Sequence, residues 1–313
     1  MSSDLKVFCG SANSRLAESI SQALGTGLSQ LSVSRFSNDN LFVQIQENVR
    51  EKDVFVIQSF TAPVSDTIME LFIILDALRS ASARRITAVI PYFSYARSDK
   101  KDAPRISIAG RLMADLIRTA GANRVLTMDL HSDAVHGFFS IPVDHLTAIP
   151  YFVDHFRSRM DLARSVVVAT DAGGAKRAGR FAKRIHLPLA IIDKRRVADT
   201  EVVQGLVVGE VAGREAIVFE DEISTGGTLA ASVSTLMAAG VKSIHVGATH
   251  GVLCGPAVKR LVASPIESIA VTDTVHISLE KQAEKIEVLS VAPLFAEAIR
   301  RIHTGESVGA LFD

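Results

Sequence analysis

The sequence predicts an α/β fold with two domains, each a mainly parallel sheet flanked by helices. The first observation is a repeated alternation of short apolar, β-branched runs with longer amphipathic segments, a pattern typical of parallel sheets covered on both faces. The second is length, because 313 residues exceed what one ordinary core accommodates. With 48% hydrophobic residues, the chain has enough apolar side chains for two cores.

Several apolar runs have the composition and length of buried strands. They are Val54–Gln58, Ile86–Ile90, Arg124–Met128, Ser165–Ala169, Ala190–Asp193, Ala216–Phe219, Ser243–Gly247 and Ser268–Val271. Ligands of such sheets collect at the carboxyl ends of the strands. The residues directly after each run are therefore the first candidates for a site.

Amphipathic segments between the runs predict helices. Apolar residues recur at helical spacing over 68–78, and Thr67 with Glu70 has the offset of a capping box. A second apolar stripe covers 229–237 and predicts a helix that closes at Gly240, a plausible C-cap residue.

A break marked by Pro142 and Pro150 is the best candidate for a domain boundary. It divides the chain into an N-terminal domain over 1–148 and a C-terminal domain over 149–292. The last segment, 293–313, begins with a helical pattern, and we expect it to join the N-terminal domain.

Charge and hydropathy exclude several kinds of partner. Lys+Arg and Asp+Glu number 34 each, so no net field attracts nucleic acid or a membrane surface. The longest apolar stretches, such as Leu71–Leu75, are too short to span a bilayer, and Met1–Gly10 lacks the pattern of a signal peptide. We expect a cytoplasmic protein without membrane or nucleic-acid partners.

The strongest site signal follows the run at 216–219. A Gly-Gly pair between hydroxyl residues opens a predicted helix, and such a turn offers backbone N–H groups to a phosphate monoester. The residues of this predicted phosphate loop are Ser224, Thr225, Gly226, Gly227 and Thr228. Glu220 and Asp221 come just before it, and their carboxylates suit the vicinal hydroxyls of a sugar phosphate. The alternative, a glycine-rich turn beside a solvated acidic face, is much less specific.

Four further strand ends carry chemistry-bearing residues. Asp171 precedes glycines that begin a helix, whose basic residues from Lys176 to Arg184 we interpret as its solvated side. His131 follows Asp129 after another strand; a lone His is more often structural than a ligand. The segment 91–101 combines aromatic and cationic residues, and 193–196 is a cationic loop; a nucleotide site and a plain surface loop remain open for both.

Taken together, these turns resemble the ribose-phosphate diphosphokinase family, the synthetases of phosphoribosyl diphosphate (PRPP). The resemblance covers essentially the whole chain. It includes Arg35-Phe36-Ser37-Asn38, Tyr95-Ala96-Arg97, Met128-Asp129-Leu130-His131, Asp171-Ala172-Gly173-Gly174-Ala175-Lys176-Arg177, Ile192-Asp193-Lys194, Thr249-His250 and Gly255-Pro256-Ala257.

The resemblance implies two phosphoribosyltransferase-like (Rossmann-like) domains and a transferase that moves the β,γ-diphosphoryl group of ATP to ribose 5-phosphate. It implies that the phosphate loop holds the 5-phosphate, that Glu220 and Asp221 meet the ribose hydroxyls, and that His131 and Asp171 are Mg²⁺-associated. Lys194 and Arg196 match the family's catalytic loop.

The resemblance also implies a nucleotide site and an assembly. Phe36, Asn38 and Asn40 match the segment that reads adenine in a neighbouring subunit, while Arg97 and Ser98 match positions near the triphosphate. A homo-oligomer follows, a hexamer or its dimer building block.

The sequence departs from the family pattern at the substrate sites. The family usually carries Glu at Asn40, Gln at Ser98 and Asp at Glu220, while Glu222 adds a charge and Ser224 replaces a frequent Asp. These changes leave open a diphosphokinase with an altered nucleotide or sugar-phosphate preference. Two further alternatives are a non-catalytic regulatory homologue and a simple phosphoribosyltransferase.

Overall fold

A computed structural model describes residues 4–193, 196–198, 201–202 and 205–311, without the side chains of 196–202. The chain forms two compact units. Unit 1 comprises Met1–Thr147, Thr274–His276 and Ser290–Asp313, and unit 2 comprises Ala148–Asp273 and Ile277–Leu289. Within the described residues, no helix has the length and hydropathy of a membrane span.

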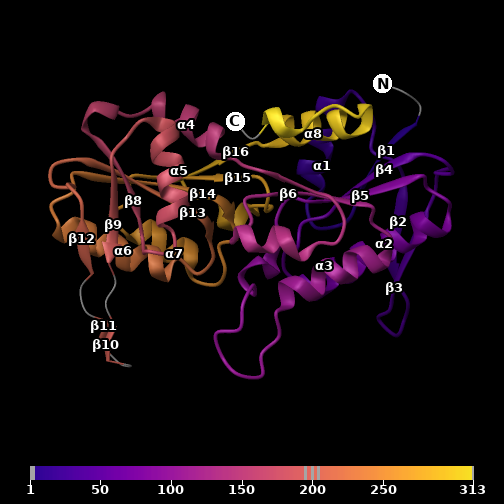
Figure 1. Cartoon of the computed structure of the whole chain (residues 1–313), viewed down its shortest axis with the longest axis horizontal. Helices are drawn as coiled ribbons and strands as arrows, with labels where there is room; N and C mark the ends of the chain where they lie inside the picture. The colour runs from indigo at the N-terminus through magenta and orange to yellow at the C-terminus, as the bar shows by residue number, and fades with distance from the viewer. Residues whose placement is uncertain (1–3, 194–195, 199–200, 203–204, 312–313) are drawn as a thin grey trace. The chain divides into compact units, whose positions relative to one another are not determined.

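Unit 1 is built on a five-stranded parallel sheet with the strand order β1-β4-β5-β6-β7. Helices α1 and α8 cover one face and α2 and α3 the other (Figure 1). A separate antiparallel hairpin, β2–β3, packs along α2. The bounds are β1 Leu5–Cys9, α1 Ser14–Leu24, β2 Leu31–Arg35, β3 Leu41–Ile45, β4 Asp53–Ile57, α2 Val64–Ser80, β5 Arg85–Ile90, α3 Ala109–Ala120, β6 Arg124–Met128, β7 Val143–Leu146 and α8 Ala292–Thr304.

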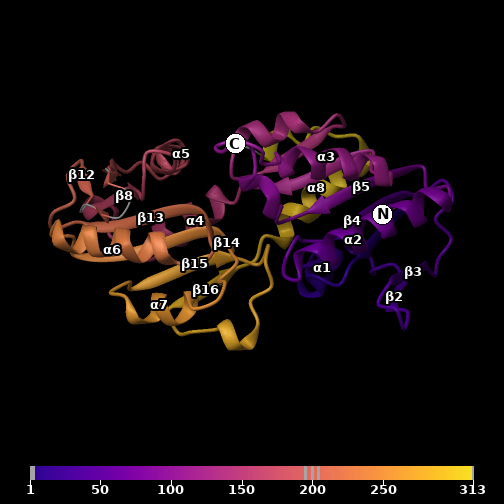
Figure 2. The same ribbon diagram turned by 90° about the horizontal axis from the view of Figure 1, so that it is seen from below.

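Unit 2 contains a seven-stranded sheet with the order β12-β9-β8-β13-β14-β15-β16, parallel except for β12 at the edge. Helices α4 and α5 lie on one face and α6 and α7 on the other (Figure 2). Two short strands, β10 and β11, pair with each other. The bounds are α4 Ile149–Arg157, β8 Ser165–Ala169, α5 Ala175–Ile185, β9 Leu189–Asp193, β10 Arg196–Ala198, β11 Glu201–Val202, β12 Leu206–Val208, β13 Glu215–Ile223, α6 Gly227–Ala238, β14 Ser243–Gly251, α7 Ala257–Ala263, β15 Ser268–Thr272 and β16 Ile286–Leu289.

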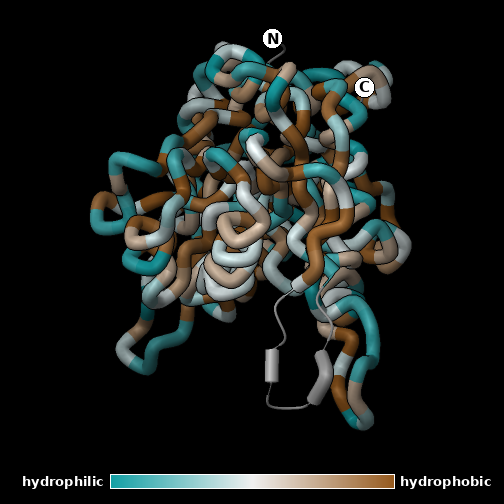
Figure 3. Tube along the Cα trace, turned by 90° about the vertical axis from the view of Figure 1, so that its left-hand side faces the viewer, coloured by the Kyte–Doolittle hydropathy of each residue, from teal (hydrophilic) through white to brown (hydrophobic). Residues whose placement is uncertain are grey.

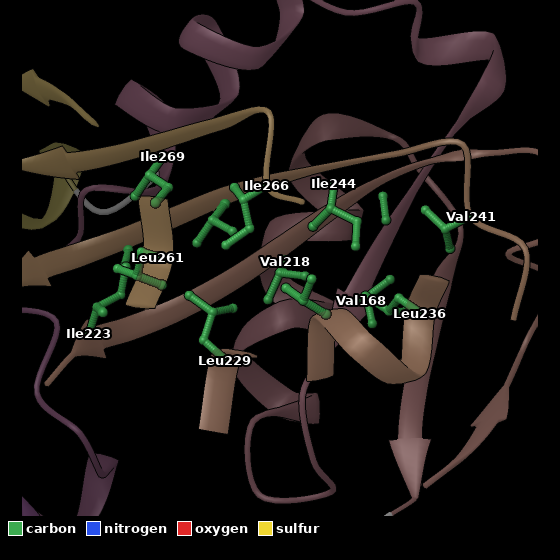
Figure 4. Packing of buried hydrophobic residues seen from close by; sticks show 14 of the residues in the cluster. Val168, Val218, Ile223, Leu229, Leu236, Val241, Ile244, Leu261, Ile266 and Ile269 are labelled. Atoms are coloured by element: carbon green, nitrogen blue, oxygen red, sulfur yellow. The ribbon is translucent and has the colours of Figure 1, made fainter. Parts of the chain in front are cut away.

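Alternation along β13 creates two cores in unit 2. Val218 faces α6 and α7 and packs with residues such as Leu229 and Leu261 (Figure 4). Phe219 points to the opposite face, where its ring stacks on Phe181 of α5 at 4.4 Å between ring centroids. Hydrophobic residues accordingly concentrate along the interior strands, and hydrophilic residues gather at outer turns (Figure 3). Each face of the central strand thus anchors a different helical layer.

The predicted fold class is confirmed: both sheets are mainly parallel and flanked by helices. The runs at 124–128 and 165–169 are strands with the predicted bounds, and α5 buries Ala178, Phe181, Ala182 and Ile185. Short strands with weaker apolar runs, such as β1, β2, β7 and β16, were not predicted. They form because the neighbouring strands of the sheet supply backbone partners.

The predicted capping box at Thr67 and Glu70 is wrong. Helix α2 begins three residues earlier, at Val64, so Thr67 lies inside the helix and its hydroxyl donates to the Val64 carbonyl. Glu70 is buried and accepts a hydrogen bond of 2.7 Å from the Ser11 amide. A distant backbone donor replaces the local one that the spacing suggested.

The C-terminal helix α8 is tied to the sheet of unit 1 by the buried carboxylate of Asp53. Asp53 accepts from Arg85 Nε at 2.7 Å and lies 2.7 Å from Nδ1 of His303, while Arg85 also donates to the Ile302 carbonyl. Asp53 is fully buried. The carboxylate therefore connects β4, β5 and α8.

We predict that Asp53→Asn lowers the free energy of unfolding by about 3 kcal/mol, because it removes the fully buried carboxylate that pairs with the half-buried guanidinium of Arg85. Chemical denaturation monitored by circular dichroism measures this loss. Asp76→Asn is the matched control: Asp76 pairs with Arg79 on the exposed surface of α2, and we expect a change below about 0.5 kcal/mol. Equal effects in both variants would contradict the role of Asp53.

Candidate active site

The candidate site of unit 2 begins where two neighbouring strands end. β8 and β13 are parallel, and Val168 is in register with Val218. The residues two positions further along, Thr170 and Glu220, are consequently neighbours at the carboxyl edge of the sheet. This edge is where parallel α/β sheets bind their ligands.

Glu220 and Asp221 lie within β13. The sequence pattern had instead placed them in the turn after the strand. The strand continues four residues beyond Phe219, because Glu222 and Ile223 remain in register with His250 and Gly251 of β14. The two carboxylates are therefore held by sheet backbone, which positions them more rigidly than a loop would.

The phosphate loop, Ser224–Thr228, leads from β13 into α6, and the segment after β14 forms hydrogen bonds to its backbone. The carbonyls of Ile223 and Ser224 accept hydrogen bonds of 2.9 Å from the amides of Leu253 and Cys254. Arg260 of α7 donates to the Thr225 carbonyl. With its carbonyls engaged, the turn keeps one conformation.

The amides of the phosphate loop are available to an anion. Helix α6 begins at Gly227, and within the described residues no backbone carbonyl accepts from the amides of 225–228. Unpaired N–H groups at a helix N-terminus carry partial positive charge. Gly226 has φ +69°, and a Cβ there would lie 3.4 Å from the side chain of Leu261, so glycine suits both the backbone and the space. The geometry is that of a phosphate-ester cradle.

Arg177 of α5 bridges the two carboxylates of β13. Its Nη1 lies 2.9 Å from Asp221 Oδ1 and 3.5 Å from Glu220 Oε2. The Arg177 side chain is only 20% exposed, so the interpretation of the basic residues of α5 as solvated is wrong for Arg177. Lys176, Arg180, Lys183 and Arg184 are exposed, as predicted. The other oxygen of Glu220, Oε1, accepts from the Thr170 hydroxyl.

Burial raises the pKa of the Glu220 carboxyl above its usual value, and the neighbouring charge of Asp221 adds to the rise. The Thr170 hydroxyl and Arg177 act in the opposite direction by stabilising the charged form. The site thus holds two adjacent acids at a cost that a cation and a hydroxyl partly offset.

The predicted metal residues belong to different units. Asp171 follows β8 in unit 2, and its Oδ1 accepts a hydrogen bond of 2.8 Å from the Gly174 amide. His131 follows β6 in unit 1. In the described part of the chain, no cluster of three or more His, Cys, Asp or Glu side chains could hold a metal ion.

The predicted adenine-reading residues lie on the turn of the β2–β3 hairpin. The Phe36 amide donates to the Asn40 carbonyl at 2.9 Å, and Asn38 Oδ1 accepts from the Asn40 amide at 3.3 Å. Phe36 is 56% exposed and packs edge-on against Phe42 at 5.4 Å between ring centroids. The hairpin presents these side chains outward.

The structure separates the roles of the residues after β5. Tyr92 and Phe93 are buried, so their rings belong to the core of unit 1 and not to a base site. Arg97 ends a 3₁₀ turn, Ser94–Arg97, at the surface. Ser98 accepts from the Ala109 amide through its hydroxyl and from the Gly110 amide through its carbonyl, which ties this turn to α3.

The predicted catalytic loop is only partly described. Lys194 lies outside the described residues. The backbone of Arg196 begins β10, which pairs antiparallel with β11.

The fold and this site define an α/β protein that presents unpaired backbone amides at a helix N-terminus beside a pair of acids. Comparison with known proteins specifies the class further. The family model described as the N-terminal domain of ribose phosphate pyrophosphokinase matches residues 5–121, and the phosphoribosyl synthetase-associated domain matches 203–313.

Relatives match over their full length. The chain is 51% identical to a ribose-phosphate pyrophosphokinase of Deinococcus radiodurans, over 99% of this chain and 98% of the relative. It is 46% identical to that of Aquifex aeolicus, over 98% and 99%. The crystal structure of phosphoribosylpyrophosphate synthetase from Mycobacterium smegmatis superposes with a TM-score of 0.92 at 39% identity, covering 96% of this chain and 99% of that one. The chain belongs to the ribose-phosphate pyrophosphokinase family, which confirms the predicted resemblance and the predicted class of transferase.

Two residues of the site were not predicted from sequence. The sequence pattern assigns Arg177 to a solvated helix face and does not single out Thr170. The contacts of both depend on the register of β8 against β13 and on the placement of α5. The sequence provides only a weak indication of these two residues, namely that both lie within eight residues of the end of β8.

We predict that Glu220→Gln raises the melting temperature at neutral pH. A raised pKa means that ionised Glu220 costs folding free energy; this cost is absent below pH 4.5, where the unfolded chain is also protonated, and grows as pH rises through the folded pKa. Gln keeps the acceptor for Thr170 without the charge. Differential scanning calorimetry at pH 7 and pH 4 measures the difference, and a gain that is no larger at pH 7 than at pH 4 would disprove it.

Proposed function

We propose that this chain transfers the β,γ-diphosphoryl group of ATP to the anomeric hydroxyl of ribose 5-phosphate, giving PRPP and AMP. In this reaction the anomeric oxygen attacks the β-phosphorus, the bond from the β-phosphorus to the bridging α,β-oxygen breaks, and AMP leaves with that oxygen. The observation that carries the proposal is the continuity of β13 with the phosphate loop: one stretch, 220–228, offers acids for a sugar diol and then amides for its phosphate.

The ribose 5-phosphate site follows from this order. The phosphate would lie on the amides of Ser224–Thr228, where the helix N-terminus favours negative charge. The hydroxyls would donate to Glu220 and Asp221, because carboxylates repel the phosphate and accept from a diol. Within the described residues, no backbone carbonyl accepts from the amides of 225–228, so binding would not displace a backbone–backbone hydrogen bond there.

The assignment of the nucleotide site rests on the family resemblance and on the exposure of the matching side chains. Phe36, Asn38 and Asn40 present an exposed ring and amides on the β2–β3 turn, and Arg97 would meet the triphosphate. Lys194 and Arg196 would neutralise charge on the transferred group, which is the main contribution a protein makes to phosphoryl transfer.

Mg²⁺ fits the residues present. This ion is commonly held by one or two carboxylates together with substrate phosphates and water. Asp171 offers such a carboxylate, and the lack of a cluster of protein ligands within the described residues agrees with an ion that enters with the nucleotide. His131 would hold ion-bound water, since Mg²⁺ favours oxygen ligands. Bound Mg²⁺ would neutralise charge on the phosphates.

A second candidate function is the same transfer with an altered nucleotide or sugar-phosphate preference. The observation in its favour is the set of departures at Asn40, Ser98 and Glu220. Ser98 bonds to the backbone at the start of α3, a task distinct from reading a triphosphate. The cytoplasmic location and the homo-oligomer stay predictions.

Mixing the full chain with ATP, ribose 5-phosphate and Mg²⁺ should yield AMP and PRPP in equal amounts, measured by ion-exchange chromatography. The matched reactions contain GTP in place of ATP, or 2-deoxyribose 5-phosphate in place of the sugar. Absence of AMP with every sugar phosphate would refute the proposed reaction, and faster transfer from GTP would favour the second candidate.

We expect Lys194→Ala to lower kcat about a thousandfold, or roughly 4 kcal/mol of transition-state stabilisation, with a smaller effect on KM. A cation that acts mainly on the developing charge affects turnover more than binding. Steady-state kinetics test this, with Lys176→Ala on α5 as a control. Near-normal kcat in Lys194→Ala would remove the loop from the mechanism.

Gly226→Ala should weaken binding of ribose 5-phosphate at least tenfold, because a side chain at φ +69° distorts the phosphate loop. Gly213→Ala is the matched control: Gly213 has φ +70° with open space around it, far along the chain from the loop. Both substitutions should cost about 1 kcal/mol of stability. Titration calorimetry with ribose 5-phosphate distinguishes them, and equal affinities would contradict the assignment of the loop.

A further inference from the structure

The geometry points to Thr170 and Arg177 as positioning residues that hold Glu220 and Asp221 for the sugar hydroxyls of the substrate. The inference rests on the proposed function and extends it to two residues that touch the acids and not the reacting atoms. Thr170 directly follows β8 and Arg177 lies in the first turn of α5, so one strand and the helix after it would orient the carboxylates of the neighbouring strand.

Thr170 is the partner of one particular oxygen. Thr170 is buried, with 2% of the residue exposed, and its hydroxyl donates to Oε1 of Glu220. A carboxylate whose Oε1 is engaged has fewer side-chain rotamers open to it. Oε2 is thereby directed to a defined place beside Arg177.

Arg177 holds the two acids as a pair. Adjacent carboxylates repel each other, and Asp221 is almost fully buried, so without a cation the site would favour protonation of one acid or a separation of the two. The 2.9 Å contact with Asp221 and the 3.5 Å contact with Glu220 leave one guanidinium nitrogen shared between them. The shared guanidinium thereby offsets part of the repulsion and keeps the two carboxyl groups near each other.

The Thr170 contact explains how the site accommodates Glu220. The family usually carries Asp at this position, so Glu220 brings one additional methylene and one additional rotatable bond. The Thr170 hydroxyl immobilises that longer side chain, and immobilised acceptors bind a diol with a smaller loss of entropy. An Asp at the same position of β13 would be too short to reach the hydroxyl in the same way.

The experiment compares Thr170→Val, which removes the hydroxyl at nearly constant shape, with Thr170→Ser, which keeps it. We expect Thr170→Val to raise KM for ribose 5-phosphate about tenfold, the effect of losing one hydrogen bond to a charged group. KM for ATP should change less than twofold, and Thr170→Ser should restore most of the affinity. Titration calorimetry with ribose 5-phosphate should give the same order of affinities, with the native chain highest, Thr170→Ser next and Thr170→Val lowest.

A double-mutant cycle tests whether Thr170 acts through Glu220. In a Glu220→Asp background, Thr170→Val should change KM for ribose 5-phosphate less than twofold, since the hydroxyl has no carboxylate within reach. An undiminished tenfold effect in that background would overturn the inference. So would Thr170→Val with an unchanged KM in the otherwise native chain.

Arg177→Lys provides an independent arm, because Lys keeps the charge and cannot bridge both acids with the same planar group. We expect a selective rise in KM for ribose 5-phosphate of about tenfold with a melting temperature close to that of the native chain. Equal losses for ATP and ribose 5-phosphate would show a structural role only and count against positioning. Failure of the native chain to make AMP would instead refute the proposed function, so the two failures are distinguishable.

Discussion

Two adjacent acids at the end of a buried strand are the constraint on which the site of unit 2 depends. Glu220 and Asp221 lie near the carboxyl end of β13, a strand with helical layers on both faces, and burial there disfavours ionised carboxylates. The structure compensates with Arg177 from α5 and Thr170 from the end of β8. Both compensating groups reach the acids only because β8 is the direct neighbour of β13 in the sheet.

The phosphate loop depends on the same strand at its other end. Because β13 stays paired with β14 as far as Ile223, the chain enters the loop in a defined direction. The amides of Leu253 and Cys254 then engage the carbonyls of the turn, so its N–H groups face away from the sheet edge that supports them. The acid pair and the unpaired amides are thus separated along one chain segment, and its backbone keeps them at a fixed spacing.

Unit 1 shows a comparable use of a buried carboxylate for a structural purpose. Asp53 begins β4, is fully buried, and binds Arg85 and His303 together. This contact joins a helix from the end of the chain to strands near its start, and α8 packs against α1 on the same face of the sheet. Buried acids in this protein therefore serve two purposes. Asp53 ties secondary-structure elements together, whereas Glu220 and Asp221 present hydrogen-bond acceptors at a strand end.

The sequence by itself determined the α/β class, most strands of the two large sheets, and the Gly-Gly turn that opens α6, because apolar runs, helical stripes and Gly-Gly turns are local patterns. The resemblance that it carries also specified the family. Tertiary structure alone decided that β13 extends through Glu220 and Asp221, that Glu70 binds Ser11 in place of a capping box, and that Arg177 faces the acids. These outcomes depend on which strands become neighbours and how helices lie on them, and no spacing within a short segment records such long-range contacts.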